Sequence, residues 1–310
     1  KSSMPFMTHK LRSDIDFALN QRPDYIALSF VSRANDIRQV RKILKKRGAD
    51  IPIIAKIERG VAVAGFDSIL EEADGIMVAR GDLGVDIPLE RLPLVQKEII
   101  QKTNRAGKPV ITATQMLESM ISAARPTRAE VTDVANAIFD GSDAVMLSAE
   151  TSVGKYPVHA VQMMSAIAVE TEKMLPYDLW ITERDSWLND QAEELISYNA
   201  ILTARRLNAA AIVAFTSSGS TAGRVAKYRP SAPILAISPN GDICRRLMLY
   251  WGVQASQIPT PKTVDDLFLT AVRLCKKLRL AKPGDQIIVT GGVPLGIAGT
   301  TNLLKVQEVE

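Results

Sequence analysis

The feature that most constrains the fold is the alternation of short apolar, β-branched runs with longer helix-like stretches. This alternation is typical of βα units around a parallel sheet, so the sequence predicts an α/β fold. The runs of the amino-terminal half are residues 25–31, 52–57, 75–79, 109–114 and 144–147.

Helices are expected between these runs, at residues 35–47, 92–106 and 127–140. Their boundaries carry capping signals. The expected amino-terminal caps are Asn35, Ser68 and Thr127, and the residues just past helix ends are Gly48, Gly107 and Gly141. About five strands are more than one half of a dinucleotide-binding fold contains and fewer than the eight of a complete barrel. The pattern alone therefore leaves the architecture of the amino-terminal half of the chain open.

A chain of 310 residues is long enough for roughly two domains. We place the first at 1–175 and the second at 191–310, joined by a connection at 176–190. That connection has aromatic residues among polar ones, so we expect it to be irregular, with its rings packed at an interface. The second domain is expected to contain helices at 191–207, 221–228, 241–249 and 264–277, and strands at 211–215, 233–237, 286–290 and 303–309.

Composition excludes several classes of protein. No apolar run approaches the roughly 18 residues that span a bilayer, and residues 1–9 lack the apolar core of a secretory signal. The 38 basic and 34 acidic residues are interspersed and give a net charge of only +4, which does not indicate nucleic-acid binding. Cys244 and Cys275 are not closely spaced, so neither a disulfide scaffold nor a zinc site is expected. We expect a cytoplasmic protein with no membrane or nucleic-acid partner; anionic small molecules remain possible ligands.

Lys56 and Glu58 end the second apolar run, two residues apart. On a strand, this spacing points both side chains to the same face. The carboxyl ends of parallel strands are where α/β proteins build active sites. The alternative is a local salt bridge at the sheet edge.

Polar residues also follow the next two runs. Asp82, in Arg80-Gly81-Asp82, could bind a hard cation such as Mg²⁺ or Mn²⁺ together with Glu58, because Mg²⁺ typically takes one or two protein carboxylates. The alternative is a turn or cap residue. Thr112 and Thr114 are expected to place two hydroxyls on one strand face, although threonine is also a good strand former.

In the second domain, hydroxyl residues follow a strand and open a helix. Free backbone N–H groups and the helix dipole favour an anion at such a helix start, so we expect a phosphate cradle, the alternative being a polar loop with an ordinary serine cap. It lacks the Walker pattern. The cradle consists of Thr216, Ser217, Ser218, Gly219, Ser220 and Thr221, and the glycine-rich loop 291–301 could close over the same anion. His9, His159 and the two cysteines are expected to be surface, cap or packing residues.

Several blocks closely resemble the pyruvate kinase family. They are residues 54–58, 77–84, 108–120, 125–130 and 227–230, together with the glycine-rich loop, and the resemblance covers essentially the whole chain. It implies a partial TIM (β/α)₈ barrel, with strands like the fourth to eighth of the family barrel, followed by a carboxyl-terminal regulatory α/β domain. It also implies phosphoryl transfer from phosphoenolpyruvate to ADP, giving pyruvate and ATP in glycolysis, with Mg²⁺ (or Mn²⁺) and K⁺.

The resemblance implies roles for individual residues. Lys56 would stabilise the transferring phosphoryl group and the developing enolate, and Glu58 and Asp82 would hold the divalent metal. The backbone from Arg80 through Gly81 to Asp82 would receive the substrate carboxylate, with Arg80 among the catalytic residues. Thr114 would lie near the substrate and the protonation step. Residues 216–221 would bind the phosphate of an allosteric effector, in a protein that is typically a homotetramer.

The chain also departs from the family pattern. We expect it to be a fragment that lacks about three barrel strands and the lid domain, with the substrate arginine and the K⁺ ligands in the missing part. An open parallel edge would favour aggregation. An inactive or effector-binding protein with a partial barrel is therefore one alternative. A metal-dependent aldolase or lyase is another, but it leaves the phosphate cradle unexplained.

Overall fold

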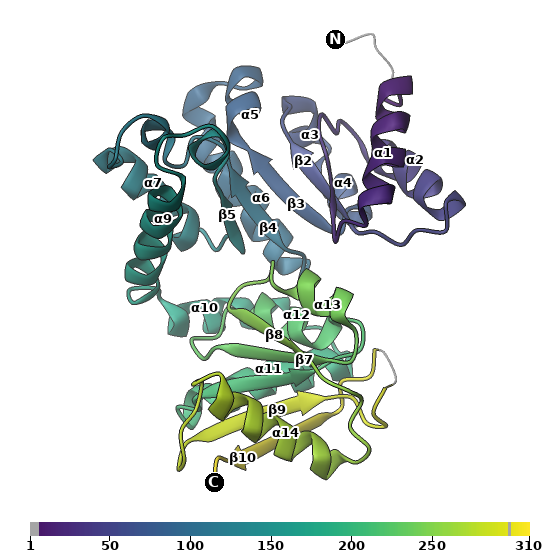
Figure 1. The fold of residues 1–310 in the computed structure, drawn as a ribbon, viewed down its shortest axis with the longest axis vertical. Coiled ribbons are helices and arrows are strands. Elements are labelled where there is room, and N and C mark those ends of the chain that lie inside the picture. The colour runs from purple at the N-terminus through teal and green to yellow at the C-terminus, as the bar shows by residue number, and fades with distance from the viewer. Residues whose placement is uncertain (1–5, 297–298) are drawn as a thin grey trace. The chain divides into compact units, whose positions relative to one another are not determined.

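The computed structural model describes residues 6–296 and 299–310, and the chain forms two compact units, Lys1–Leu175 and Pro176–Glu310 (Figure 1). The prediction that residues 176–190 form an irregular connection is wrong. Residues 176–190 lie in the second unit, where they form helix α10 (Tyr177–Arg184) and the 3-10 helix η3 (Asp185–Trp187). Burial explains the helix, because Trp180 packs edge-on against Trp251 at 6.0 Å within that unit.

The first unit contains a parallel sheet of five strands in the order β1-β2-β3-β4-β5, at the five predicted positions. Neighbouring strands are consecutive in the chain and separated by helices, as in a βα barrel. The strands are β1 (Ile26–Leu28), β2 (Ile53–Ile57), β3 (Gly75–Ala79), β4 (Val110–Ala113) and β5 (Ala144–Met146). The helices are α1 (His9–Gln21), α2 (Ala34–Lys46), α3 (Gly60–Ala64), α4 (Phe66–Glu72), α5 (Arg80–Asp86), η1 (Leu89–Arg91), α6 (Leu92–Arg105), η2 (Glu118–Ile121), α7 (Arg128–Phe139), α8 (Ala149–Ser152) and α9 (Pro157–Glu172).

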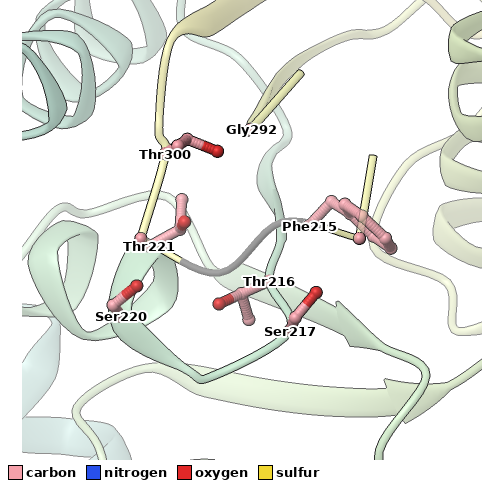
Figure 2. A pocket seen from close by; sticks show the side chains of 9 residues that line it. Phe215, Thr216, Ser217, Ser220, Thr221, Gly292 and Thr300 are labelled. Carbon is pink, nitrogen blue, oxygen red and sulfur yellow. The ribbon is translucent and has the colours of Figure 1, made fainter. Parts of the chain in front are cut away.

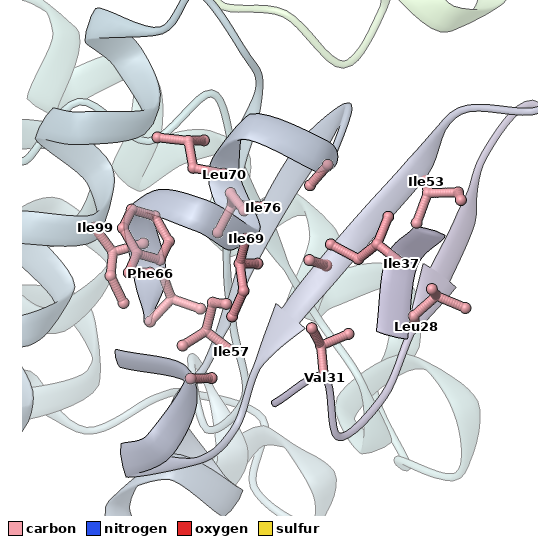
Figure 3. Close-up of a cluster of buried hydrophobic side chains, with 14 of the residues drawn as sticks. Leu28, Val31, Ile37, Ile53, Ile57, Phe66, Ile69, Leu70, Ile76 and Ile99 are labelled. Carbon is pink, nitrogen blue, oxygen red and sulfur yellow. The ribbon is translucent and has the colours of Figure 1, made fainter. Parts of the chain in front are cut away.

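The two faces of this sheet have different roles. Ile53, Ala55 and Ile57 of β2 belong to a buried core that also contains side chains of α2, α4 and α6 (Figure 3). Because successive strand residues point to opposite faces, Ile54 and Lys56 lie on the other face. The helix-covered face therefore stabilises the unit, and the opposite face is free to carry polar groups.

Helix ends follow the predicted signals in part. Thr127 caps α7 in a reciprocal capping box with Glu130, as expected. The predictions that Asn35 and Ser68 are amino-terminal caps were wrong. Both residues lie inside helices, α2 and α4, whose capping positions are Arg33 and Gly65. Gly48, Gly107 and Gly141 do lie just past helix ends with positive φ angles of 69°, 68° and 94°.

The second unit is a sheet covered on both faces, because two separate cores lie against it. Its strand order is β10-β9-β6-β7-β8, and only β10 is antiparallel to its neighbour. The strands are β6 (Ala211–Phe215), β7 (Ile234–Ser238), β8 (Val253–Gln257), β9 (Gln286–Gly291) and β10 (Leu303–Glu308), and the further helices are α11 (Ala192–Arg206), α12 (Ser220–Lys227), α13 (Gly241–Leu247) and α14 (Val264–Lys277). Strand β8 was not predicted, because as an edge strand it tolerates polar residues such as Gln254 and Gln257.

No helix in residues 6–296 or 299–310 is long and apolar enough to cross a membrane.

Candidate active site

The predicted site residues of the first unit lie where β2, β3 and β4 end. Lys56 is on β2 with Glu58 directly after it, Arg80 to Asp82 open α5 directly after β3, and Thr114 directly follows β4. Parallel strands bring these ends to one edge of the sheet.

Lys56 and Glu58 are in contact, as their spacing predicted. Lys56 Nζ lies 2.5 Å from Glu58 Oε1 and donates a hydrogen bond to Ser29 Oγ at 2.8 Å. Glu58 is 2% exposed and Lys56 is partly exposed, so the carboxylate is buried behind an ammonium group that reaches the surface. An ion pair of this kind fits both the local salt bridge and the catalytic interpretation.

The segment after β1 completes the surroundings of Glu58 and was missed by the sequence reasoning. The Phe30 backbone N–H donates to Glu58 Oε2 at 2.5 Å, and Phe30 has a positive φ of 56°. Such backbone conformations in non-glycine residues cluster at functional sites. The available signal was Ser29, a polar residue within the first apolar run.

Glu58 is suited to a cation. Its Oε1 is buried and accepts no hydrogen bond of good geometry from the described residues, although Lys56 Nζ is close. Asp82 is exposed in the first turn of α5, and no side-chain hydrogen bond caps that helix. Across residues 6–296 and 299–310, no three His, Cys, Asp or Glu side chains gather into a metal site. Mg²⁺ usually takes only one or two protein carboxylates and fills its other coordination positions with water and other oxygens. Glu58 and Asp82 would therefore be enough for Mg²⁺ without a third protein ligand.

Thr114 does not share a strand face with Thr112, so that prediction was wrong. Thr112 is fully buried, and its hydroxyl bonds to Ser142 Oγ at 2.7 Å. At Thr114 the backbone turns into the left-handed region with φ 71°, and Gln115 follows with φ 54°. This turn takes Thr114 out of the strand. Each residue held in such a conformation costs about 1–3 kcal/mol, so the surrounding contacts must offset that cost.

Thr114 and Arg80 join the segments after β3 and β4. Thr114 Oγ1 accepts from the Gly81 N–H at 2.8 Å. Arg80, with a side chain 10% exposed, donates to the Thr114 carbonyl at 2.8 Å and the Ala113 carbonyl at 3.3 Å, and pairs with Asp133 Oδ1 at 2.6 Å. The described contacts of the guanidinium are thus all with the protein itself, and the Gly81 amide lies at the sheet edge where β3 ends.

Two carboxylates hold the residues that follow Thr114. Buried Glu150 accepts from the backbone N–H groups of Leu117 and Ser148. Glu130 accepts from the backbone and hydroxyl of Ser119 at 2.7 and 2.6 Å. Partial burial opposes ionisation of Glu130, but hydrogen bonds from Ser119 and Thr127 outweigh it and lower its pKa.

In the second unit, four of the six residues of the predicted cradle line one pocket together with residues of the glycine-rich loop. Figure 2 shows the side chains of Thr216, Ser217, Ser220 and Thr221 around it, with Gly292 and Thr300 opposite. Residues 297–298 of that loop lie outside the described residues. A Cβ at Gly292 would be 1.8 Å from the Thr300 carbonyl oxygen, so only glycine permits this close approach.

The hydroxyls of this cradle divide into two groups. Thr216 Oγ1 accepts from the Gly219 N–H at 2.9 Å, and Thr221 Oγ1 bonds to Thr301 Oγ1 at 2.8 Å, so these two stabilise the loop. Ser217 and Ser220 are half-buried at the pocket, and Ser218 is exposed. Helix α12 has no side-chain amino-terminal cap, which leaves its first N–H groups for an anion and disfavours the ordinary serine cap.

The histidines and cysteines behave as expected. His9 and His159 are exposed on helices α1 and α9. Cys244 and Cys275 are free and buried, and burial raises the pKa of both thiols, that of Cys275 to about 11. High thiol pKa values fit packing rather than nucleophilic catalysis.

Comparison with known proteins shows the family of the chain. Residues 1–161 match the family model "Pyruvate kinase, barrel domain", and residues 194–307 match "Pyruvate kinase, alpha/beta domain". The chain belongs to the pyruvate kinase family. The predicted fold class, a partial barrel followed by an α/β domain, is confirmed.

Individual pyruvate kinases are similar over the entire chain. The enzyme of Geobacillus stearothermophilus is 50% identical over 310 residues, 100% of this chain and 53% of that protein. That of Clostridium acetobutylicum is 45% identical over 308 residues, 99% of this chain and 65% of that protein. A crystal structure of a pyruvate kinase from Cryptosporidium parvum superposes with a TM-score of 0.95 at 41% identity, covering 100% of this chain and 64% of that one. The chain thus spans about half to two thirds of the pyruvate kinases it matches.

Proposed function

We propose that the chain carries the phosphoryl-transfer site of a pyruvate kinase, which converts phosphoenolpyruvate and ADP to pyruvate and ATP in glycolysis. The observation that carries the proposal is the contact between Lys56 and buried Glu58 at the same sheet edge as the Gly81 amide and Thr114. Phosphoryl transfer depends on positioning and on neutralising charge, so a cation, two carboxylates and a backbone donor are suitable components.

Each residue has a proposed task. Lys56 stabilises negative charge that develops on the transferred phosphoryl group and on the enolate oxygen. The Gly81 N–H, with the backbone around Arg80 and Asp82, receives the substrate carboxylate, and Thr114 stands beside the carbon that is protonated. Glu58 and Asp82 would hold Mg²⁺ or Mn²⁺, which supplies charge neutralisation for the phosphoryl oxygens when bound.

The test is Mg²⁺-dependent ATP formation from phosphoenolpyruvate and ADP by the 310-residue chain, with Lys56→Met as the control. Turnover that disappears in Lys56→Met supports the proposal. Full turnover in Lys56→Met contradicts the assigned role. Absence of turnover in folded wild-type chain favours the inactive, effector-binding alternative for this length of chain.

Metal binding provides a readout that needs no turnover. Mn²⁺ binding, followed by electron paramagnetic resonance, is expected to weaken in Glu58→Gln and in Asp82→Asn. Glu72→Gln, which removes a surface partner of Arg38, is the matched control. Equal Mn²⁺ affinity in all four proteins would contradict the assignment of Glu58 and Asp82 as metal ligands.

We also propose that the pocket of the second unit binds the phosphate of an allosteric effector. Ser217 and Ser220, which line the pocket, and the uncapped start of α12 support this, because they offer hydroxyl and N–H donors, and exposed Ser218 lies between them in the chain. Inorganic phosphate and a sugar phosphate are expected to raise the melting temperature of the wild-type chain but not of Ser220→Glu, whose added negative charge repels an anion. Equal shifts in both proteins would contradict the site.

The remaining parts of the proposal concern the whole protein. A homotetramer is supported by exposed apolar side chains at Val85, Leu89 and Leu94, which a partner subunit could cover. Two free cysteines support a reducing compartment, the cytoplasm. K⁺ is included as a cofactor, and we assign it no ligands within this chain.

A further inference from the structure

We propose that Asp133 is a positioning residue for the active site, acting through Arg80 on the strained backbone of Thr114 and Gln115. This inference rests on the proposed phosphoryl-transfer function. Asp133 lies on α7 and is 53 positions from Arg80 in the chain. No sequence motif links the two residues.

The strained backbone is the reason that a positioning residue is needed. Thr114 and Gln115 are consecutive non-glycine residues in the left-handed region. Such a conformation persists only where the surrounding structure holds it, because ordinary side chains favour other regions. Relaxation of either residue would move the Thr114 hydroxyl away from the Gly81 N–H.

Arg80 supplies the restraint. Its Nε and Nη2 donate to the carbonyl oxygens of Ala113 and Thr114, which flank the first left-handed residue, and Nη2 also lies 2.8 Å from Met116 Sδ. A planar guanidinium with several fixed donors can hold two carbonyl groups in one orientation, which a lysine ammonium group cannot do as rigidly.

Asp133 in turn fixes Arg80. Among the described residues it is the only carboxylate paired with this guanidinium, at 2.6 Å from Nη1. The Arg80 side chain is largely buried, so loss of the carboxylate would leave a desolvated charge without a counter-charge and favour its movement toward water. The restraint on Thr114 would then weaken.

The end of this series of contacts is the proposed substrate site. The Gly81 N–H, which is proposed to receive the substrate carboxylate, bonds to Thr114 Oγ1 at 2.8 Å. A Cβ added at Gly81 would lie 3.6 Å from both Cβ and Oγ1 of Thr114, so the two residues are packed together. Asp133 therefore influences the substrate site without touching it.

The first test compares Asp133→Asn with Asp74→Asn. Asp74 is a matched control, because it also pairs with an arginine, Arg41, at 2.9 Å. The Asp74 side chain is 39% exposed and that of Asp133 is 36% exposed. Asp74 lies before β3, at the end of the strand opposite to Arg80. Exchange of the Gly81 amide, measured by NMR, is expected to be about 10-fold faster in Asp133→Asn and unchanged in Asp74→Asn. Equal exchange in wild type and Asp133→Asn would overturn the proposal, and this outcome does not depend on catalysis.

The second test is a double-mutant cycle on turnover. Asp133→Asn is expected to lower kcat about 10- to 100-fold with little change in the KM for ADP, because it misplaces Thr114 rather than removing a binding group. In a Thr114→Val background the same substitution should have almost no further effect. If the effects of the two substitutions on kcat multiply in the double variant, the proposal is overturned. Absence of turnover in the wild-type chain would instead count against the proposed function. The amide-exchange result would then decide the role of Asp133.

Discussion

The backbone N–H of Gly81 donates to the side-chain oxygen of Thr114 at 2.8 Å, so the segments that follow two neighbouring strands are bonded to each other. A threonine hydroxyl and a substrate carboxylate would both accept from this N–H. The position of Thr114 therefore affects how the proposed substrate site is formed, as well as any proton transfer near it.

Thr114→Val is expected to lower kcat about 100-fold, because valine keeps the shape and β-branching of threonine but cannot accept from Gly81. Thr114→Ser retains the oxygen and should keep more of the activity. Steady-state turnover of phosphoenolpyruvate and ADP, with circular dichroism to confirm folding, measures both. A valine variant as active as the serine variant would show that the oxygen is not required.

Lys56→Met should lower kcat about 100- to 1,000-fold, a loss comparable to removing one transition-state donor. Loss of a transition-state contact should lower kcat more than it raises the KM for phosphoenolpyruvate. Lys102→Met, which removes a surface cation paired with Asp67, is the control and should retain its activity. A rise in KM alone would mean that Lys56 only binds substrate.

Glu130→Gln should destabilise the chain at neutral pH, by about 1 kcal/mol for a capping interaction. The folded-state pKa of Glu130 is below its ordinary 4.5, so its contribution is fully present above pH 4.5 and is lost as the pH falls through the folded-state value. Urea unfolding of wild type and variant should therefore differ at pH 7 and converge under acidic conditions. A gap that stayed constant down to low pH would contradict this role for the ionised carboxylate.

Glu194→Gln should be strongly destabilising, by about 3–5 kcal/mol. Its Oε1 accepts hydrogen bonds from Lys227 and from the hydroxyl of Tyr228, and all three residues are buried. Removing the charge would leave buried Lys227 without its counter-charge. Thermal unfolding should show the loss, while Glu193→Gln, a change at the preceding residue of α11, should unfold like wild type.

Local patterns were enough to predict much of the chain. The alternation of apolar runs and helices predicted five strands of the first sheet, and the capping box predicted the start of α7. The contact between Lys56 and Glu58 followed from a two-residue spacing, because side chains alternate along a strand. Strand β8 and helix α10 were not predicted. Their sequences contain many polar residues, and both elements form because of contacts with neighbouring elements.

The sequence by itself determined the α/β class, the order of the elements and the residues that end each strand, because these depend on periodicities within a few residues. Only the tertiary structure decided that Arg80 bonds to the backbone at Ala113 and Thr114 and pairs with Asp133, and that Thr114 leaves its strand in a left-handed conformation. The physical reason is that these features depend on contacts between residues tens of positions apart. Such contacts offset local backbone strain and bring charges together only once the sheet and its helices have packed.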